Sequence, residues 1–345
     1  MSDNVRLPSL STFPRLLMHH AQVRPNHPAT REKDMGIWQT WTWSQVAEEV
    51  RAMASGLAEL GFKRGDNLAI IGDNRPRLYW AMCAAQCLGG VPVPLYQDAV
   101  AAEMVFVLQD AGIKFAIVED QEQVDKLLEN MAQCPDLQHI LYDDPRGMRH
   151  YNQTFLHGLD EVQEMGRIHN RNHPEFVDGE IVLGKPQDVA VMLYTSGTTG
   201  KPKGVCLTHG AFIAAAQSGC EFDKLGPDDN ILSYLPMAWV GDHLFSFAQA
   251  TYAGFTINCP ESGDTVMTDM REIGPSYYFA PPRVFENLLT QVMIRMEDAG
   301  AIKRNMFHYF MGVARRCGAE ILDGKPVASS DRLLYALGNL LIYGP

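Results

Sequence analysis

The chain has 345 residues, of which 46% are apolar and 20% are charged, a composition typical of globular proteins. This excludes a largely disordered chain, a collagen and a coiled coil, and the length suggests one large domain or two domains of ~150 residues each. With 29 basic and 41 acidic residues the formal net charge is −12, so the composition indicates no nucleic-acid partner.

The seven cysteines are scattered, and their odd number without a Cys-x-x-Cys pair argues against a disulfide framework. Cys83 and Cys87 would share one helix face, but no histidine accompanies them at zinc-ligand spacing, so we expect buried thiols and no protein-bound metal site. The chain begins without a signal-peptide pattern, and glycines and prolines interrupt its longest apolar stretch, residues 78–96, before the ~20 residues that span a bilayer. These features favour a cytoplasmic protein and leave open a peripheral contact with a membrane surface.

The first half of the chain alternates between helical and strand patterns. Thr42 and Gln45 form a capping box before apolar residues at helical spacing, which predicts a helix that Gly61 can terminate. The predicted helices cover 42–60, 77–88, 104–110 and 124–131, and the predicted strands cover 67–72, 91–95, 115–118 and 139–142. Such alternation is typical of right-handed βαβ units, so we expect an α/β fold of layered, mostly parallel sheets flanked by helices.

Residues 145–187 are polar and weakly patterned. Their histidines, among them His150, His157 and His169, are irregularly spaced, which favours solvated side chains over metal ligands. We therefore expect a connecting region here.

The most informative segment is residues 195–204 (TSGTTGKPKG), which follows a strand predicted over 189–194. Its glycines permit close approach of a ligand and allow successive N–H groups to form an anion-binding nest. Its hydroxyl groups add donors, and Lys203 can supply a positive charge. This combination suits a polyphosphate. A further strand over 205–207 and a helix over 210–218, capped by Thr208, are predicted to follow.

The spacing of this loop differs from that of two familiar nucleotide-binding loops. A Walker A loop places four residues between its first glycine and the Gly-Lys pair, whereas two residues separate Gly197 from Gly200. The Gly-x-Gly-x-x-Gly pattern of dinucleotide folds does not occur here either.

The segment Tyr194–Val205 (YTSGTTGKPKGV) resembles the signature loop of the adenylate-forming, or AMP-binding, superfamily, which includes acyl-CoA synthetases, luciferases and the adenylation domains of peptide synthetases. The resemblance implies that this loop holds the phosphates of ATP, through side-chain donors and through glycines that make room for the ligand. The residues that it assigns to phosphate binding are Thr195, Ser196, Gly197, Thr198, Thr199, Gly200, Lys203 and Gly204.

Other segments extend the resemblance along the chain. Leu88–Tyr96 and Leu235–Ala238 resemble family elements, and Pro281–Glu286 resembles an element of the long-chain fatty-acid–CoA ligase branch. Helices predicted over 284–296 and 305–320 resemble an insertion of that branch. The resemblance implies a fatty-acid substrate, ATP with Mg²⁺, and CoA as co-substrate.

The resemblance also implies an incomplete large N-terminal domain over 1–345. Its approximate subdomains are 71–224 and 1–70 with 226–345, and the small C-terminal domain is absent. The family's ribose-binding aspartate, adenine-stacking segment and C-terminal lysine are not found, so we expect the chain alone to be inactive, and no catalytic residue is assigned.

One departure concerns the acyl end of the site. Where the family branch usually has a histidine after its Leu-Pro-x-Ala segment, this chain has Trp239, and His243 follows four residues later. We expect Tyr234, Trp239 and His243 to line an acyl pocket, with an ordinary core position as the equal alternative for Trp239. Two other functions stay open: a fatty acyl-AMP ligase that loads a carrier protein, and a truncated, inactive nucleotide- or lipid-binding protein. The sequence leaves the oligomeric state open.

Overall fold

The computed structural model describes residues 10–195 and 202–344. Its chain divides into two compact units, the first ending at Tyr278 and the second beginning at Phe279. The expected subdomains, 71–224 and 1–70 with 226–345, stay a prediction.

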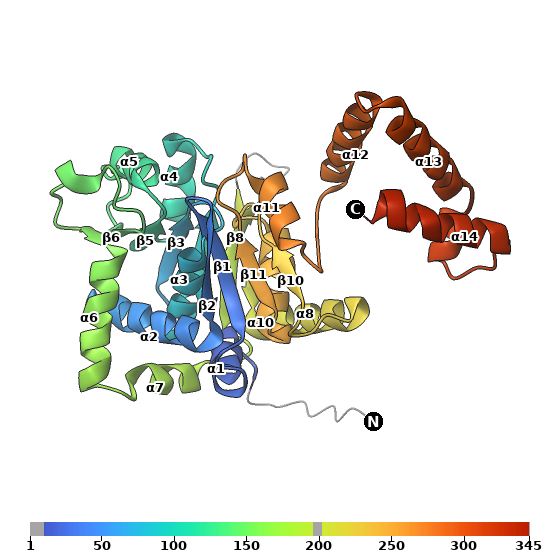
Figure 1. Ribbon diagram of the computed structural model, residues 1–345. Coiled ribbons are helices and arrows are strands. Elements are labelled where there is room, and N and C mark those ends of the chain that lie inside the picture. Colours follow the sequence, from blue (N-terminus) through green and yellow to red (C-terminus); the bar gives the residue numbers. More distant parts are fainter. Residues whose placement is uncertain (1–9, 196–201, 345) are drawn as a thin grey trace. The chain divides into compact units, whose positions relative to one another are not determined.

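A five-stranded parallel sheet forms one side of the first unit (Figure 1). Its strands are β3 (Asn67–Ile71), β4 (Val91–Leu95), β5 (Phe115–Val118), β6 (His139–Tyr142) and β7 (Leu156–Gly158). Their order, β4-β3-β5-β6-β7, is that of a doubly wound fold. Alternate residues enter two cores on opposite faces of the sheet, with Leu68 and Ile70 in one and Ala69 and Ile71 in the other. Burial on both faces explains the unbroken apolar runs and confirms the α/β fold class.

The helices predicted before and between these strands are confirmed with small shifts at their ends. They are α2 (Trp43–Glu59), α3 (Pro76–Cys87), α4 (Ala101–Asp110) and α5 (Gln121–Asn130). The capping box at α2 is formed as expected: the Thr42 N–H donates to Gln45 Oε1 at 2.9 Å, and the Gln45 N–H donates to Thr42 Oγ1 at 3.4 Å. Cys83 and Cys87 are both buried on α3.

A four-stranded sheet joins distant parts of the chain. Its order is β10-β11-β1-β2, with strands β1 (Pro28–Asp34), β2 (Ile37–Thr42), β10 (Asn230–Leu232) and β11 (Thr256–Cys259). The strands β1 and β2 form an antiparallel hairpin, whereas β1 runs parallel to β11 with Thr30 opposite Ile257. The sequence did not predict this hairpin, because its first strand (PATREKD) carries four charged residues among seven.

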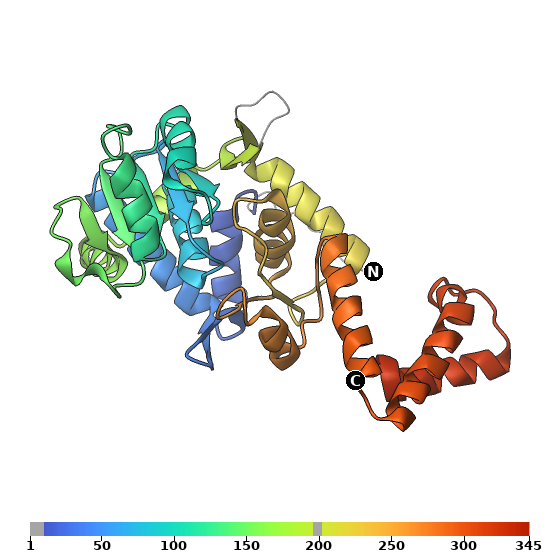
Figure 2. The ribbon, with the colours of Figure 1, turned by 90° about the horizontal axis from the view of Figure 1, so that it is seen from above.

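A third, two-stranded antiparallel sheet consists of β8 (Val189–Thr195) and β9 (Lys203–Thr208). Both strands were predicted, but each extends further into the segment 195–204 than its apolar residues indicated. Helix α8 (His209–Asp223) follows, and the Ala211 N–H donates to the predicted capping residue Thr208 at Oγ1, 3.3 Å away. Figure 2 shows α8 leading away from this hairpin.

The prediction of a connecting region over 145–187 was wrong. This stretch holds a short 3₁₀ turn (η1, Met148–His150), strand β7, helix α6 (Leu159–Asn172) and helix α7 (Phe176–Leu183). Helix α6 packs closely on α2 because glycines occupy the contact. A Cβ at Gly166 would lie 1.8 Å from Ala52 O, and one at Gly56 would lie 2.2 Å from Val162 O. Leu159 and Val162 are buried at helical spacing, but most residues of α6 are polar, so the composition of this stretch resembles that of a loop.

The remaining helices of the first unit flank the sheets. They are α1 (Phe13–Val23), α9 (Val240–Asp242), the π-helix η2 (His243–Ala248), α10 (Gln249–Ala253) and α11 (Val266–Ile273).

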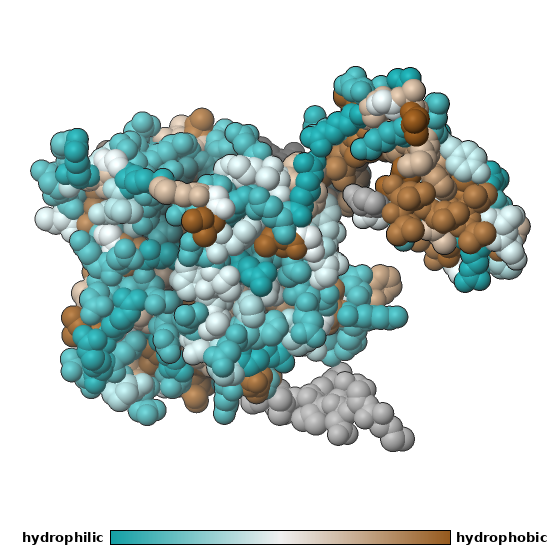
Figure 3. All heavy atoms as spheres, viewed as in Figure 1, coloured by the Kyte–Doolittle hydropathy of each residue, from teal (hydrophilic) through white to brown (hydrophobic). Residues whose placement is uncertain are grey.

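The second unit is helical and contains the two helices predicted from the sequence. Its elements are α12 (Pro282–Glu297), α13 (Ala301–Leu322), α14 (Ser329–Gly338) and the π-helix η3 (Asn339–Tyr343). Phe307, Phe310 and Val313 of α13 are buried, whereas Leu337 of α14 and Leu340 of η3 are exposed. Figure 3 shows apolar side chains gathered on one face of this unit. Within the described part of the chain, no helix is long and apolar enough to cross a bilayer.

Candidate functional site

The two ends of the expected phosphate loop lie opposite each other in the β8–β9 hairpin. Thr195, the last residue of β8, pairs with Lys203, the first residue of β9, and Tyr194 pairs with Gly204. The hydroxyl and the ammonium group therefore come from the two strands that frame the loop. The other five expected phosphate residues lie outside the described residues: Ser196, Gly197, Thr198, Thr199 and Gly200.

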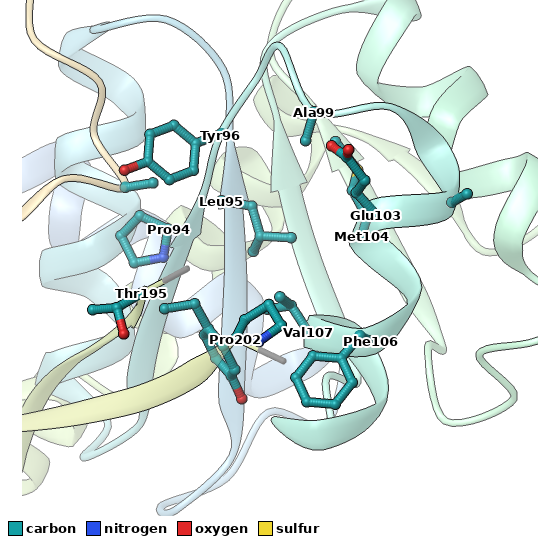
Figure 4. Close-up of a pocket in the computed structure, with 13 residues that line it drawn as sticks. Pro94, Leu95, Tyr96, Ala99, Glu103, Met104, Phe106, Val107, Thr195 and Pro202 are labelled. Atoms are coloured by element: carbon teal, nitrogen blue, oxygen red, sulfur yellow. The ribbon is translucent and has the colours of Figure 1, made fainter. Parts of the chain in front are cut away.

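A cavity of about 610 Å³ lies beside this hairpin. Strand β4 and the residues after it form one side, with Pro94, Leu95 and Tyr96, and α4 forms another (Figure 4). Its other lining residues come from the turn after β4, from α4, from the hairpin and from the segment after β10: Ala99, Ala102, Glu103, Met104, Phe106, Val107, Tyr194, Thr195, Pro202 and Ala238. Apolar side chains predominate, and the size is within the range of small-molecule pockets. The cavity could hold an apolar group whose polar end approaches the Thr195 hydroxyl.

The residues expected to form the acyl pocket lie in different environments. The ring of Tyr234 stacks on Tyr278 with a centroid separation of 5.6 Å. Trp239 is partly buried at the start of α9, where its ring covers Gly241 so closely that a Cβ there would lie 2.4 Å away. Their neighbour Ala238 lines the cavity beside the hairpin. A common pocket for Tyr234, Trp239 and His243 stays a prediction.

His243 is fully buried at the start of the π-helix η2. Its ring lies 5.5 Å from that of Phe212 and 5.2 Å from that of Phe247, measured between centroids. Burial lowers the pKa of His243 to about 3, and neither ring nitrogen has a hydrogen-bond partner among the described residues. The imidazole is therefore neutral in the folded state.

Next to His243, the carboxylate of Asp242 is fully buried and is held by neutral donors. The Tyr79 hydroxyl donates to its Oδ2 at 2.7 Å, and the Ser233 hydroxyl donates to Oδ1 at 2.7 Å. The side-chain amide of Asn74 lies 3.2 Å from Oδ1. Burial raises the pKa of Asp242 to about 6, while these hydrogen bonds oppose the rise. The network ties the segment after β3 and helix α3 to the end of β10 and to α9.

Sequence reasoning missed this network. Asn74 and Tyr79 lie 168 and 163 residues before Asp242, and no spacing rule links positions so far apart. The four consecutive residues Leu235–Ala238 resemble a family segment, but the polar residues on either side of them carry no separate signal in the sequence.

A second cavity is lined mainly by charged residues. Arg75 joins its parts: the Nε atom donates to Glu119 Oε1 at 2.7 Å, and two other nitrogens donate to the carbonyls of Pro260 and Glu261. Burial raises the pKa of nearby Glu32 to about 7, against the opposing effect of the Arg75 charge. Within residues 10–195 and 202–344, no group of three or more His, Cys, Asp or Glu side chains is arranged to hold a metal ion.

Comparisons with known proteins give consistent results. The model of the family described as AMP-binding enzyme matches residues 17–331. The chain is 26% identical to the long-chain-fatty-acid–CoA ligase ACSBG1 of Homo sapiens over 285 residues, which are 80% of this chain and 38% of that protein. It is 26% identical to the long-chain-fatty-acid–CoA ligase ACSBG2 of Xenopus laevis over 352 residues, 99% of this chain and 46% of that protein. The chain thus spans less than half the length of both curated relatives.

A solved structure supports the same relationship. The inhibitor-bound N-terminal domain of FACL13 from Mycobacterium tuberculosis matches with a TM-score of 0.64 and 26% identity, covering 80% of this chain and 64% of that one.

Proposed function

The chain belongs to the AMP-binding enzyme family, and on that premise we propose that the complete protein activates a long-chain fatty acid with ATP and transfers the acyl group to CoA. The curated relatives named as long-chain-fatty-acid–CoA ligases support this substrate. The observation that carries the proposal is the hairpin β8–β9, which places Thr195 opposite Lys203, with Thr195 lining a largely apolar cavity.

In the first step, a carboxylate oxygen of the acid forms a bond to the α-phosphorus of ATP, and the bond from that phosphorus to pyrophosphate breaks. Phosphoryl transfer depends chiefly on positioning and on neutralisation of charge. The loop 195–204 would bind the leaving pyrophosphate through Thr195, Lys203 and the N–H groups near Gly204. Mg²⁺ would neutralise further negative charge on the phosphate oxygens, because such hard oxygen ligands are the ones that it prefers.

In the second step, the CoA sulfur attacks the acyl carbonyl and AMP leaves. Formation of acyl-AMP without consumption of CoA would instead indicate an enzyme that loads a carrier protein.

The test is ATP–pyrophosphate exchange by the complete protein, with fatty acids of different lengths, comparing the wild type with Lys203→Ala. Loss of a charge-assisted contact to phosphate should lower the exchange rate roughly ten- to a hundredfold. Lys185→Ala is the matched control, because Lys185 is an exposed lysine in a loop of the same unit. An equal rate for Lys203→Ala and the wild type would remove Lys203 from the proposed site, and a wild type without exchange for any acid would contradict the proposed function.

A further inference from the structure

The strands that frame the loop make few backbone hydrogen bonds to the rest of the unit. The strands β8 and β9 pair only with each other among the described strands, and residues 203–206 of β9 are exposed. One buried hydrogen bond reaches the β8 backbone, from the Gln86 side chain to Ala190 O at 2.8 Å, and side chains on β8 make the other contacts that hold the hairpin against the rest of the unit. Val191 and Leu193 point to one face of β8 and are buried. Met192 and Tyr194 point to the other face and pack against the hydrophobic core to which α4 contributes.

Tyr194 makes the most specific of these contacts. Its ring packs edge-on against Phe106 of α4, with centroids 6.5 Å apart and an interplanar angle of 84°. Its hydroxyl donates to Asp110 Oδ2 at 2.7 Å. Burial and the neighbouring Asp110 raise the pKa of Tyr194, so the phenol keeps its proton at neutral pH.

The position of Asp110 is unfavourable for helix α4 by itself. Asp110 is the last residue of α4, where the helix dipole disfavours a negative charge. A hydrogen bond from Tyr194 compensates this charge and connects the end of α4 to the hairpin. A neutral residue at position 110 would avoid the unfavourable interaction between the Asp110 charge and the helix dipole.

Across the hairpin, Gly204 makes room for the Tyr194 ring. A Cβ at Gly204 would lie 3.1 Å from Tyr194 Cζ and 3.0 Å from Met192 Sδ. The Tyr194 ring therefore lies close to the backbone at the start of β9, where Lys203 precedes Gly204. Tyr194 thus precedes one framing residue, Thr195, in the chain and lies opposite Gly204, which follows the other, Lys203.

From this arrangement we propose that Tyr194 and Asp110 are a positioning pair, which anchors the hairpin to α4 and so sets where Thr195 and Lys203 meet the phosphates of ATP. The proposal rests on the proposed function of the loop. The pair acts through the hairpin and does not itself touch ATP. Breaking the pair should weaken binding of MgATP more than binding of the fatty acid.

The test measures ATP–pyrophosphate exchange by the complete protein as a function of MgATP and of fatty-acid concentration. Tyr194→Phe and Asp110→Leu should each raise the KM for MgATP roughly three- to tenfold, the scale of one lost solvent-exposed hydrogen bond, and change the KM for the fatty acid less than twofold. Asp110→Asn should recover most of the affinity, because its amide oxygen still accepts from the phenol. The double variant Tyr194→Phe/Asp110→Leu should match the single variants, since both remove the same bond.

Tyr151→Phe is the matched control. Its hydroxyl donates to Asp125 in the same unit, so the same chemical change is made away from the hairpin. This variant should keep the wild-type KM for MgATP. The proposal is overturned if Tyr194→Phe and Asp110→Leu keep the wild-type KM for MgATP in an active enzyme, or if both KM values rise alike together with a fall in melting temperature. A wild type that shows no exchange contradicts the proposed function itself, and the positioning pair falls with it.

Discussion

Replacing Tyr79 with phenylalanine tests how the buried Asp242 carboxylate is held. The Tyr79 hydroxyl donates to Asp242 Oδ2 at 2.7 Å and lies 2.6 Å from Ser233 Oγ. Phenylalanine keeps the ring that stacks on Phe247, so the change removes hydrogen bonds and little volume. A hydrogen bond to a charged group contributes about 1.5–3 kcal/mol, and we expect Tyr79→Phe to lower the free energy of unfolding by that amount at pH 7.5.

The cost of this substitution should depend on pH. The pKa of Asp242 is about 6 in the folded state, and that of an aspartate in an unfolded chain is ~3.9. The stability that protonation of Asp242 contributes is therefore fully present below about pH 4 and is lost as the pH rises through 6. Removing a donor to the charged form raises the folded-state pKa further. Tyr79→Phe should accordingly cost about 1 kcal/mol less at pH 5 than at pH 7.5.

The assay is urea unfolding of the wild type and the variant at pH 7.5 and pH 5, followed by tryptophan fluorescence. Tyr151→Phe serves as control, because it removes a phenol from the partly buried Asp125. That control should lose less than about 1 kcal/mol at both pH values. An equal cost of Tyr79→Phe at the two pH values would refute the view that Asp242 is charged in the folded protein at neutral pH.

Three further substitutions address other features. Burial lowers the pKa of His243 to about 3, so the stability that the neutral imidazole contributes is present above pH ~6.5 and is lost as the pH falls toward 3. His243→Phe should reduce this loss of unfolding free energy, measured by urea unfolding between pH 7 and 4.5. An unchanged pH dependence would count against a neutral, buried imidazole. Gly166→Ala should lower the unfolding free energy by about 1–3 kcal/mol because its Cβ would meet Ala52 O, whereas Gly179→Ala, with open space around it, should not; thermal melts compare the two. In the complete enzyme, Trp239→Ala should change the preferred fatty-acid length gradually, since one methylene contributes only about 1–3 kcal/mol, and a superimposable chain-length profile would make Trp239 a core residue.

The sequence predicts the buried strands best. Residues 91–95, 115–118 and 139–142 were predicted with the bounds that the structure has, because both faces of the parallel sheet require apolar side chains. Strand β1 was not predicted because its charged residues are not typical of a strand inside a sheet. In the structure some of these residues form ion pairs with residues far along the chain. Lys33, for example, is buried and lies 2.8 Å from Asp269 and 2.7 Å from Glu272.

The residues of the candidate site also differ in how well the sequence predicts their roles. The glycines, hydroxyls and lysines of the loop are consecutive in the sequence, so their chemistry can be inferred without a structure. The Tyr194–Asp110 contact joins residues 84 positions apart, and its partner helix was predicted only from Met104 onward. Contacts of this kind arise from the arrangement of elements in space, which local patterns do not specify.

The parallel pairing of β1 with β11 has a consequence for synthesis on the ribosome. Thr30 pairs with Ile257, so β1 emerges 227 residues before its partner, the difference between these two positions. At roughly 5–20 residues per second, translation takes about 10–45 s to deliver that partner. During this interval one edge of β1 has no strand beside it, and exposed edges favour pairing with other chains. The charged residues Arg31, Glu32 and Lys33 on β1 oppose such pairing. The same charges that make this strand difficult to predict from the sequence therefore also protect the nascent chain from aggregation.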